Sequence, residues 1–358
     1  MSRIRRIRRK KPRTGSVWKK LLLWGVLGLL VLAAAAVAGS YLYVRAYLKS
    51  DGFLAMLEQS AVDDMNVETA RIDPLDWDGS GIRCGGVTME GHEFLTSLQA
   101  RNIETEFSRW ELLKRAFVIT SVNIAELKLR LAPVPFRFRE KPEGARSWAE
   151  ENILPDTFRL EKGSIDSLSV SYGEAGRLYV LDGARVESAY DAGSSQYRFD
   201  VRGGKLLLPF QGCPEFSLMS GTAQFNHSSR RVNIPSCRLT TDAGGYLDIK
   251  GDWDGSSSSW TANVVVNGVP VSSILEDHWR KHVHGSVSGG IDLRGGRDGV
   301  THVAGLARLQ GGMLTGLPVL DRLALFCGSS RFRNLPLHEA SAQFVYQESA
   351  WHISNILV

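Results

Sequence analysis

Apolar and polar residues alternate one by one along most of the chain from about residue 67 onward. A period of two is typical of β-strands that present one apolar and one polar face. Turn sequences that contain Gly separate the alternating segments, and we count roughly eighteen to twenty strand candidates on these signals. The sequence therefore predicts a mainly β protein whose strands follow one another as a long antiparallel sheet.

The segment 118–131 shows this alternation with one interruption. Its apolar positions are even-numbered up to Ile124 and odd-numbered from Leu127, so the phase slips at Ala125. A β-bulge adds one residue to a strand and restores the facing of the side chains that follow. We therefore predict a bulge at Ala125 that keeps the apolar side chains on one face.

Six sequences of turn type are expected to join strands: Asp78-Gly79, Glu90-Gly91, Asp182-Gly183, Arg202-Gly203-Gly204, Asp254-Gly255 and Arg294-Gly295-Gly296. Short helices are expected where the period changes to that of a helix. They are a helix from Asp51, which can cap its N-terminus, a short helix within 270–284, and a helix over 317–326 closed by Gly328.

These features divide the chain into six parts. They are a basic tail (1–20), an uncharged segment (21–44), an N-terminal β region (45–132), a loop rich in Pro and charge (133–147), a central β region (148–310) and a C-terminal β region (311–358). The alternation still continues at 351–357, and the sequence stops at Val358. We therefore expect the last region to be incomplete.

Residues 21–44 carry no charged side chain, and ten Lys or Arg residues stand in positions 1–20. A helix of that length reaches ~36 Å, which is enough to cross a hydrocarbon core of ~30 Å. Because Lys and Arg gather on the cytoplasmic side of spanning helices, the segment predicts a single-pass anchor with a cytoplasmic N-terminus. The anchor positions that we single out are Leu21, Trp24, Leu30, Ala36 and Tyr43.

The N-terminal region also fits two other interpretations. Ala36-Val37-Ala38 has the small-residue pattern of a signal cleavage site, but the apolar run exceeds the ~7–15 residues of a signal core. The basic tail also fits a nucleic-acid-binding arm, but basic residues beside a spanning helix more often set topology and contact anionic lipid headgroups. We favour an uncleaved anchor.

The charge balance beyond the tail argues against a nucleic-acid partner. Of 43 basic residues, ten lie in positions 1–20, so 33 face all 38 acidic residues and the remainder carries −5. The pI near 9.0 therefore reflects the tail. A mildly acidic chain without a polybasic patch lacks the electrostatic footprint of a nucleic-acid-binding domain.

The sequence contains few groups suited to catalysis. It has no P-loop, nucleophile elbow, HExxH or Gly-rich dinucleotide motif. The best metal candidate is the group His278, His282 and His284, in which the first two are four residues apart and share a helix face. No second ligand set accompanies it, so we predict a protein that is not an enzyme and has no cofactor.

Four cysteines occur, without CxxC or metal-type spacing: Cys84, Cys213, Cys237 and Cys327. Cys213 and Cys237 flank a plausible hairpin and are the first pair to test for a disulfide. Small buried residues are an equally good explanation of all four.

A sheet with one apolar face must cover that face, close on itself or leave the face to a ligand. The few predicted helices cannot cover about eighteen strands. We therefore expect a curled, groove-like sheet, and with strands ~4.8 Å apart a groove on the order of 100 Å long. The candidate lipid-facing residues are Val118, Val122, Ile124, Leu127, Leu129, Leu131, Val170, Val264, Val266 and Phe344.

Both ends of the region after the anchor resemble the AsmA-like family. The first hairpin resembles the family pattern "I.L.W.GS.I" from Ile72 to Ile82, and "SV.I....L.L" is matched from Ser121 to Leu129. The segment 311–344 is similar to the AsmA-like C-terminal region, in which a small helix precedes a strand pair. The chain stops where members of the family continue, which indicates a fragment or a short member.

The resemblance implies a long β-groove anchored in the bacterial inner membrane, with its bulk in the periplasm. It implies passage of phospholipids toward the outer membrane, or support of outer-membrane biogenesis. We therefore expect phospholipids, and possibly other cell-envelope proteins, as partners. The alternative is a structural or scaffolding β-protein of the envelope that binds no lipid.

Overall fold

The computed structural model describes residues 46, 50–77, 81–91, 94–108, 116–134, 157–174, 176–209, 213–226, 228–275, 277–297, 299–347 and 350–357. The chain divides into two compact units, Met1–Leu54 and Ala55–Val358. The second unit contains a single eighteen-stranded sheet, so the predicted β class and the expected number of strands are confirmed.

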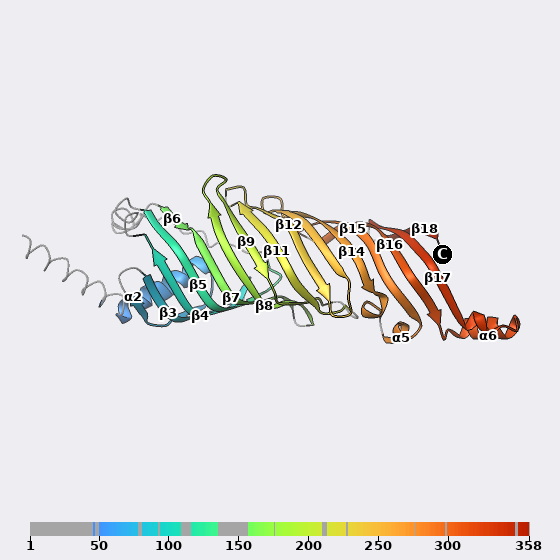
Figure 1. The fold of residues 1–358 in the computed structure, drawn as a ribbon. Helices are drawn as coiled ribbons and strands as arrows, with labels where there is room; N and C mark the ends of the chain where they lie inside the picture. The colour runs from blue at the N-terminus through green and yellow to red at the C-terminus, as the bar shows by residue number, and fades with distance from the viewer. Residues whose placement is uncertain are drawn as a thin grey trace, which may run out of the picture. The chain divides into compact units, whose positions relative to one another are not determined.

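The described strands follow one another along the chain. The first nine are β1 (Thr69–Ile72), β2 (Leu75–Trp77), β3 (Gly81–Glu90), β4 (Leu95–Phe107), β5 (Ala116–Leu131), β6 (Thr157–Leu160), β7 (Lys162–Glu174), β8 (Arg177–Asp191) and β9 (Gln196–Arg202). The others are β10 (Lys205–Leu207), β11 (Phe216–Asn226), β12 (Arg231–Thr241), β13 (Tyr246–Asp254), β14 (Ser259–Pro270), β15 (Val283–Gly296), β16 (Gly299–Thr315), β17 (Asn334–Gln347) and β18 (Ala350–Leu357). Figure 1 shows β11 to β18 side by side in chain order.

The sheet is mixed, which corrects the prediction of an antiparallel sheet. Both β6 and β7 pair with β5 in the parallel sense, while the other pairs are antiparallel among the strands described. Parallel neighbours need a crossover connection, and the chain between Leu131 and Thr157 supplies it. An alternating pattern has no direction, so the periodicity alone could not indicate this pairing.

At three positions across the sheet, two strands lie end to end and share the position. β1 and β2 both pair with β3, β6 and β7 both pair with β5, and β9 and β10 both lie between β8 and β11. The eighteen strands therefore occupy fifteen positions across the sheet. At ~4.8 Å per step the sheet is about 67 Å from first to last strand, shorter than the ~100 Å expected from counting every strand separately.

Two of the predicted turns are kinks inside strand positions. Gly203 and Gly204 separate β9 from β10 with φ of 69° and 88°, and both strands keep the same neighbours. A Cβ on Gly204 would lie 2.9 Å from the backbone nitrogen of Ala184, so a larger residue does not fit. Gly183 lies inside β8 with φ of 71°. Another predicted turn, Asp254-Gly255, does join β13 to β14.

The phase slip at Ala125 is present but is not a bulge between β4 and β5. The register continues from Arg101–Glu126 to Ile103–Ile124 without a shift, because β4 makes the same adjustment at Asn102, whose φ is 51°. Apolar side chains on both sides of the slip thereby stay on one face. Two strands that bend together keep their pairing, whereas a bulge would change it.

The described helices are short. They are α2 (Asp51–Met65), α5 (Asp277–Arg280) and α6 (Pro318–Phe326), with 3-10 turns η1 (Val271–Ser273) and η2 (Ser330–Arg333). Helix α2 is capped by Ser50, whose side-chain oxygen accepts a hydrogen bond from the Phe53 N–H at 3.3 Å, so Asp51 is the first helical residue and not the cap. Helix α6 is confirmed, with Pro318 in its first turn and Gly328 (φ 62°) after its end.

The hydrophobic core is small for so long a sheet. Fifteen apolar side chains are buried among the residues described. One cluster consists of Phe216, Leu218 and Leu239, against which Leu181 and Leu247 pack. Most other apolar side chains of the strands keep partial access to solvent.

Candidate functional site

An unbroken row of residues crosses the sheet from β3 to β18, each directly opposite the next. Residues paired in this way lie on the same face of a sheet. The row consists of Cys84, Ile103, Ile124, Ile165, Val186, Val201, Gly221, Cys237, Ile249, Val264, Ile291, Gly305, Phe344 and Ile353. It contains no charged side chain, and we call it the apolar row.

Strand β14 shows how the two faces differ. Trp260, Ala262, Val264 and Val266 are half-buried, whereas Thr261, Asn263 and Val265 between them are exposed. Val264 and Val265 are the same residue type, yet only Val264 belongs to the apolar row. The face therefore sets the exposure here, and the residue type does not.

Glycines in two strands of this face make room for neighbouring aromatic rings. A Cβ on Gly305 would lie 2.5 Å from the ring of Phe344, and one on Gly295 would lie still closer to the indole of Trp260. Each ring thus lies over the backbone of the adjacent strand. At each of these glycines, the aromatic ring from the adjacent strand fills the place of the missing side chain and keeps the surface apolar.

The predicted lipid-facing residues are brought together by the register. Ile124, Val264 and Phe344 belong to the apolar row. Each of the others is paired with a residue on a neighbouring strand. Val122 is paired with Thr105, Leu127 with Leu168, Leu129 with Val170, Leu131 with Tyr172, and Val266 with Leu247. Val118 is 4% exposed, so its side chain belongs to the core.

Sequence reasoning did not single out most members of the apolar row. Ile103, Ile165 and Ile291, for example, alternate with polar neighbours, but nothing in a single strand shows which residue it will face. The sequence signal for these residues was the recurrence of β-branched side chains at alternate positions of a strand. Their alignment depends on the register, including the parallel pairing of Ile124 with Ile165.

The opposite face carries ion pairs and polar contacts. Arg198 pairs with Asp200 at 3.1 Å between Nε and Oδ2, and Arg238 pairs with Asp248 at 2.7 Å between Nε and Oδ1. These partners hold the pKa of both aspartates below the ordinary value. Exposed pairs of this kind add little to stability. Their effect is to keep this face hydrated.

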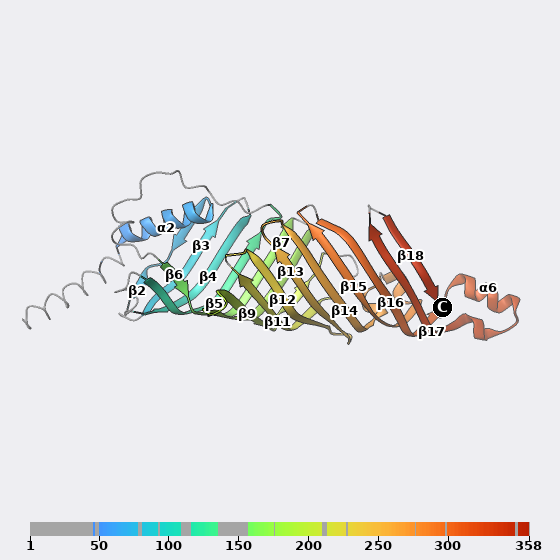
Figure 2. The ribbon, with the colours of Figure 1, turned by 90° about the horizontal axis from the view of Figure 1, so that it is seen from above.

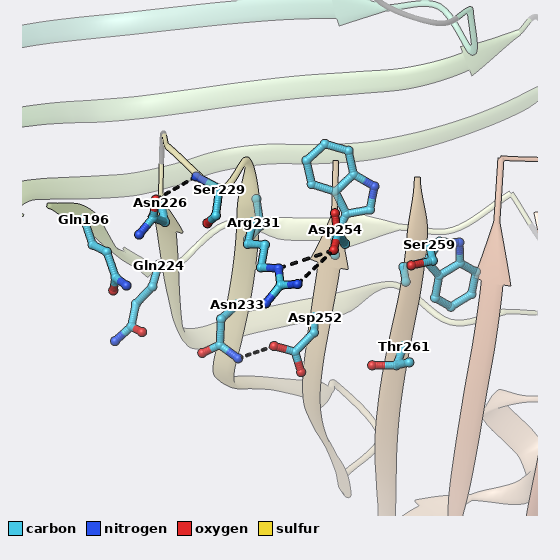
Figure 3. A pocket seen from close by; sticks show the side chains of 13 residues that line it. Gln196, Gln224, Asn226, Ser229, Arg231, Asn233, Asp252, Asp254, Ser259 and Thr261 are labelled. Carbon is cyan, nitrogen blue, oxygen red and sulfur yellow. Dashed lines mark hydrogen bonds and ion pairs between the residues drawn. The ribbon is translucent and has the colours of Figure 1, made fainter. Parts of the chain in front are cut away.

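A hollow of about 500 Å³ lies between polar residues of β9 and β11 to β14 (Figure 3). The Arg231 guanidinium reaches Asp254, and the Asn233 amide donates to Asp252 at 2.6 Å. Hydrogen bonds from Ser256, from its side chain foremost, lower the pKa of Asp254 to about 2. A carboxylate that stays ionised at neutral pH cannot donate a proton there, so Asp254 is unsuited to the role of general acid.

All four cysteines are free thiols in the structure. Cys213 and Cys237 both pack against the cluster of Phe216, Leu218 and Leu239, and burial raises the pKa of each thiol. Cys237 is also a member of the apolar row. The disulfide between them stays a prediction.

The histidine group is only partly assembled. The rings of His278 and His282 are 5.7 Å apart between centroids, and Nδ1 of His282 lies 2.8 Å from the Thr315 carbonyl oxygen. His284 lies near the same threonine, with 3.4 Å between Nε2 and Oγ1. Within the described ranges, no group of three or more His, Cys, Asp or Glu residues could hold a metal ion.

The predicted anchor positions from Leu21 to Tyr43 lie outside the described residues. In the part of the chain that the structure does describe, none of the helices combines the length and the apolar character that a membrane span requires.

Comparison with family models, with characterised proteins and with solved structures finds no match for this chain.

Proposed function

We propose that the chain binds the acyl chains of phospholipids on the face that carries the apolar row and conducts lipid along that face. In this proposal residues 21–44 anchor the chain in the inner membrane of a bacterium with two membranes, and the sheet lies in the periplasm. The observation that carries the proposal is the apolar row itself, which crosses fourteen strand positions without a charged side chain. The AsmA-like motifs of the sequence support the same function.

The length of the row suits lipid better than a small ligand. Thirteen steps of ~4.8 Å make about 62 Å, several times the ~15 Å that one leaflet contributes to a ~30 Å hydrocarbon core. Several acyl chains could lie along it. Each methylene group removed from water contributes about 0.8 kcal/mol, so contact with the half-buried members of the row stabilises a bound lipid.

The curled, groove-like form of the sheet belongs to this proposal. A flat sheet with one apolar face would expose that face fully or require a second layer. The apolar residues of β14 are half-buried while their polar neighbours are exposed, as a sheet curved toward its apolar side would make them. Polar headgroups would then lie along the opening and acyl chains inside.

Adjacent valines on opposite faces provide the test. A photo-reactive amino acid is placed at Val264 or at Val265 in the full chain, expressed in a bacterium with two membranes, and crosslinked lipid is measured by mass spectrometry. We expect at least tenfold more phospholipid on position 264 than on position 265. Equal labelling at the two positions would refute the proposal and favour the alternative, an envelope scaffold without bound lipid.

A further inference from the structure

Helix α6 exposes an apolar surface that no described residue covers. Leu325 is 77% exposed and Phe326 is 91% exposed, more than any other large apolar side chain described. On the same helix, Val319 is 66% exposed and Leu323 is 41% exposed. Soluble surfaces rarely gather such side chains on one short segment, and where they do the patch usually contacts a partner or a membrane.

The helix has two apolar stripes with different roles. Leu320 and Ala324 are four residues apart, buried, and hold the helix to the protein, where it packs mainly against η2. Val319, Leu323 and Phe326 follow the spacing of a second stripe, which faces water, and Leu325 extends this exposed apolar surface beyond the stripe. A single stripe would suffice to attach a surface helix, so the second is available for an external contact.

The charge around the helix is opposite to that of the surrounding chain. Residues 317–333 contain Arg322, Arg331 and Arg333 against one acidic residue, Asp321. Asp321 pairs with Arg333 at 3.6 Å between Oδ1 and Nε. The segment is therefore +2 in a region that is −5 beyond residue 20. Apolar side chains flanked by arginines are the composition of helices that lie in an anionic membrane surface.

The helix lies beside strands that carry the apolar row. It follows β16 and precedes β17, the strands that carry Gly305 and Phe344 of the row. Figures 1 and 2 both show α6 beyond β17, on the side of the sheet that ends in β18.

We infer that α6 inserts its exposed apolar surface into an anionic phospholipid surface and brings the strands β16 and β17 of the apolar row close to that surface. This inference rests on the proposed function for its meaning, since it supplies the place where lipid enters or leaves the row. The contact itself is a separate property, and it has a separate measurement.

The full chain, held in nanodiscs of zwitterionic lipid, is mixed with sucrose-loaded vesicles and sedimented. Vesicles with about one-third anionic lipid are compared with purely zwitterionic ones. We expect anionic vesicles to carry down at least fivefold more protein, and the double variant Leu325→Glu/Phe326→Glu to sediment less with them than the unaltered chain, because the basic tail contributes equally in both. Met219→Glu is the matched control, because Met219 is an exposed apolar residue on β11, 57% exposed, and we expect it to sediment like the unaltered chain.

The native thiol next to the stripe provides a second measurement. Cys327 is exposed, so an environment-sensitive fluorophore attached there should shift to the blue on adding anionic vesicles in the unaltered chain and not in the double variant. Unchanged sedimentation of the double variant, or equal sedimentation with both vesicle types, would overturn the inference. So would a dimer that the double variant dissociates, because the stripe would then join two copies.

Crosslinking at Val264 separates the two proposals. If the double variant sediments less with anionic vesicles but still crosslinks phospholipid at Val264, both stand. If vesicle binding does not depend on α6 while Val264 crosslinks lipid, only the inference about α6 fails. If α6 binds vesicles and Val264 crosslinks no more than Val265, the proposed conduit fails and a membrane-contacting helix remains.

Discussion

The strands in the middle of the sheet and the C-terminal strands with α6 use apolar side chains differently. In β8 and β12, Val186 and Leu239 are 7% and 3% exposed. In β18 and α6, Ile353 and Phe326 are 62% and 91% exposed. The middle of the sheet uses apolar burial to hold itself together. The C-terminal part leaves similar groups accessible, and accessible groups can bind.

The largest expected difference between these regions is in stability. Leu239→Ala removes a buried side chain from the cluster of Phe216 and Leu218, and we expect a loss of about 2–5 kcal/mol in the free energy of unfolding. Phe326→Ala removes a larger but exposed side chain, and we expect a change within about 0.5 kcal/mol. Chemical denaturation followed by circular dichroism measures both. Similar losses in the two variants would mean that α6 is packed in solution.

The second difference concerns the two faces. Val264→Asp places a charge in the apolar row and should reduce the phospholipid that co-purifies with the chain about tenfold or more, because an acyl chain cannot solvate a carboxylate. Val265→Asp makes the same chemical change on the polar face and should leave co-purifying lipid unchanged. Lipid extraction and mass spectrometry of the two folded variants, checked by circular dichroism, decide the matter. Equal lipid in both would contradict the assignment of the faces.

The third difference is in thiol reactivity. Cys327 is exposed near α6, whereas burial raises the pKa of Cys237 and lowers its share of the reactive thiolate at neutral pH. A maleimide should therefore label Cys327 at least several-fold faster than Cys237 in the native chain. Peptide mapping after timed labelling measures the two rates. Protection of Cys213 and Cys237 that a reductant removes would instead reveal their disulfide.

The smallest expected effect lies at the turn between β13 and β14. Asp254 has a pKa of about 2, below its ordinary 3.8, so its contribution to stability is complete above about pH 4 and is lost as the pH falls through about 2. Ser256→Ala removes the hydrogen bond that lowers this pKa most, and the Asp254 pKa should rise toward the ordinary value. A pH titration of the Asp254 carboxyl carbon by NMR measures the shift. Thr261→Ala, on the neighbouring strand, should leave it unchanged.

The strands and α6 could be predicted because their signals are local. Alternation marks a strand wherever one face is less hydrated than the other, and Pro318 and Gly328 mark the ends of α6 in the sequence itself. The turns were less certain. Asp182-Gly183 and Arg202-Gly203-Gly204 have the composition of hairpin turns, but a Gly that kinks a strand has the same composition. Only the neighbouring strands distinguish the two cases.

The candidate lipid-facing residues also divide into those that the sequence could predict and those that only strand pairing could identify. Val264 and Phe344 could be proposed as lipid-facing from their alternation alone, whereas Ile103, Ile165 and Ile291 join them only through pairing. Val118 has the same pattern as Val122 and is nevertheless buried. Alternation states which residues share a face within one strand. It does not state how deeply that face is buried or what stands opposite.

The amino-acid sequence by itself determined that this chain is mainly β and that its strands have one apolar face. It also determined that the net positive charge lies in residues 1–20. These properties follow from residue order over a few positions. Tertiary structure alone decided the parallel pairing of β5 with β7, the strands that lie end to end, the unbroken apolar row and the exposure of Phe326. The physical reason is that register and burial depend on residues far apart in the chain, which meet only once the sheet has formed.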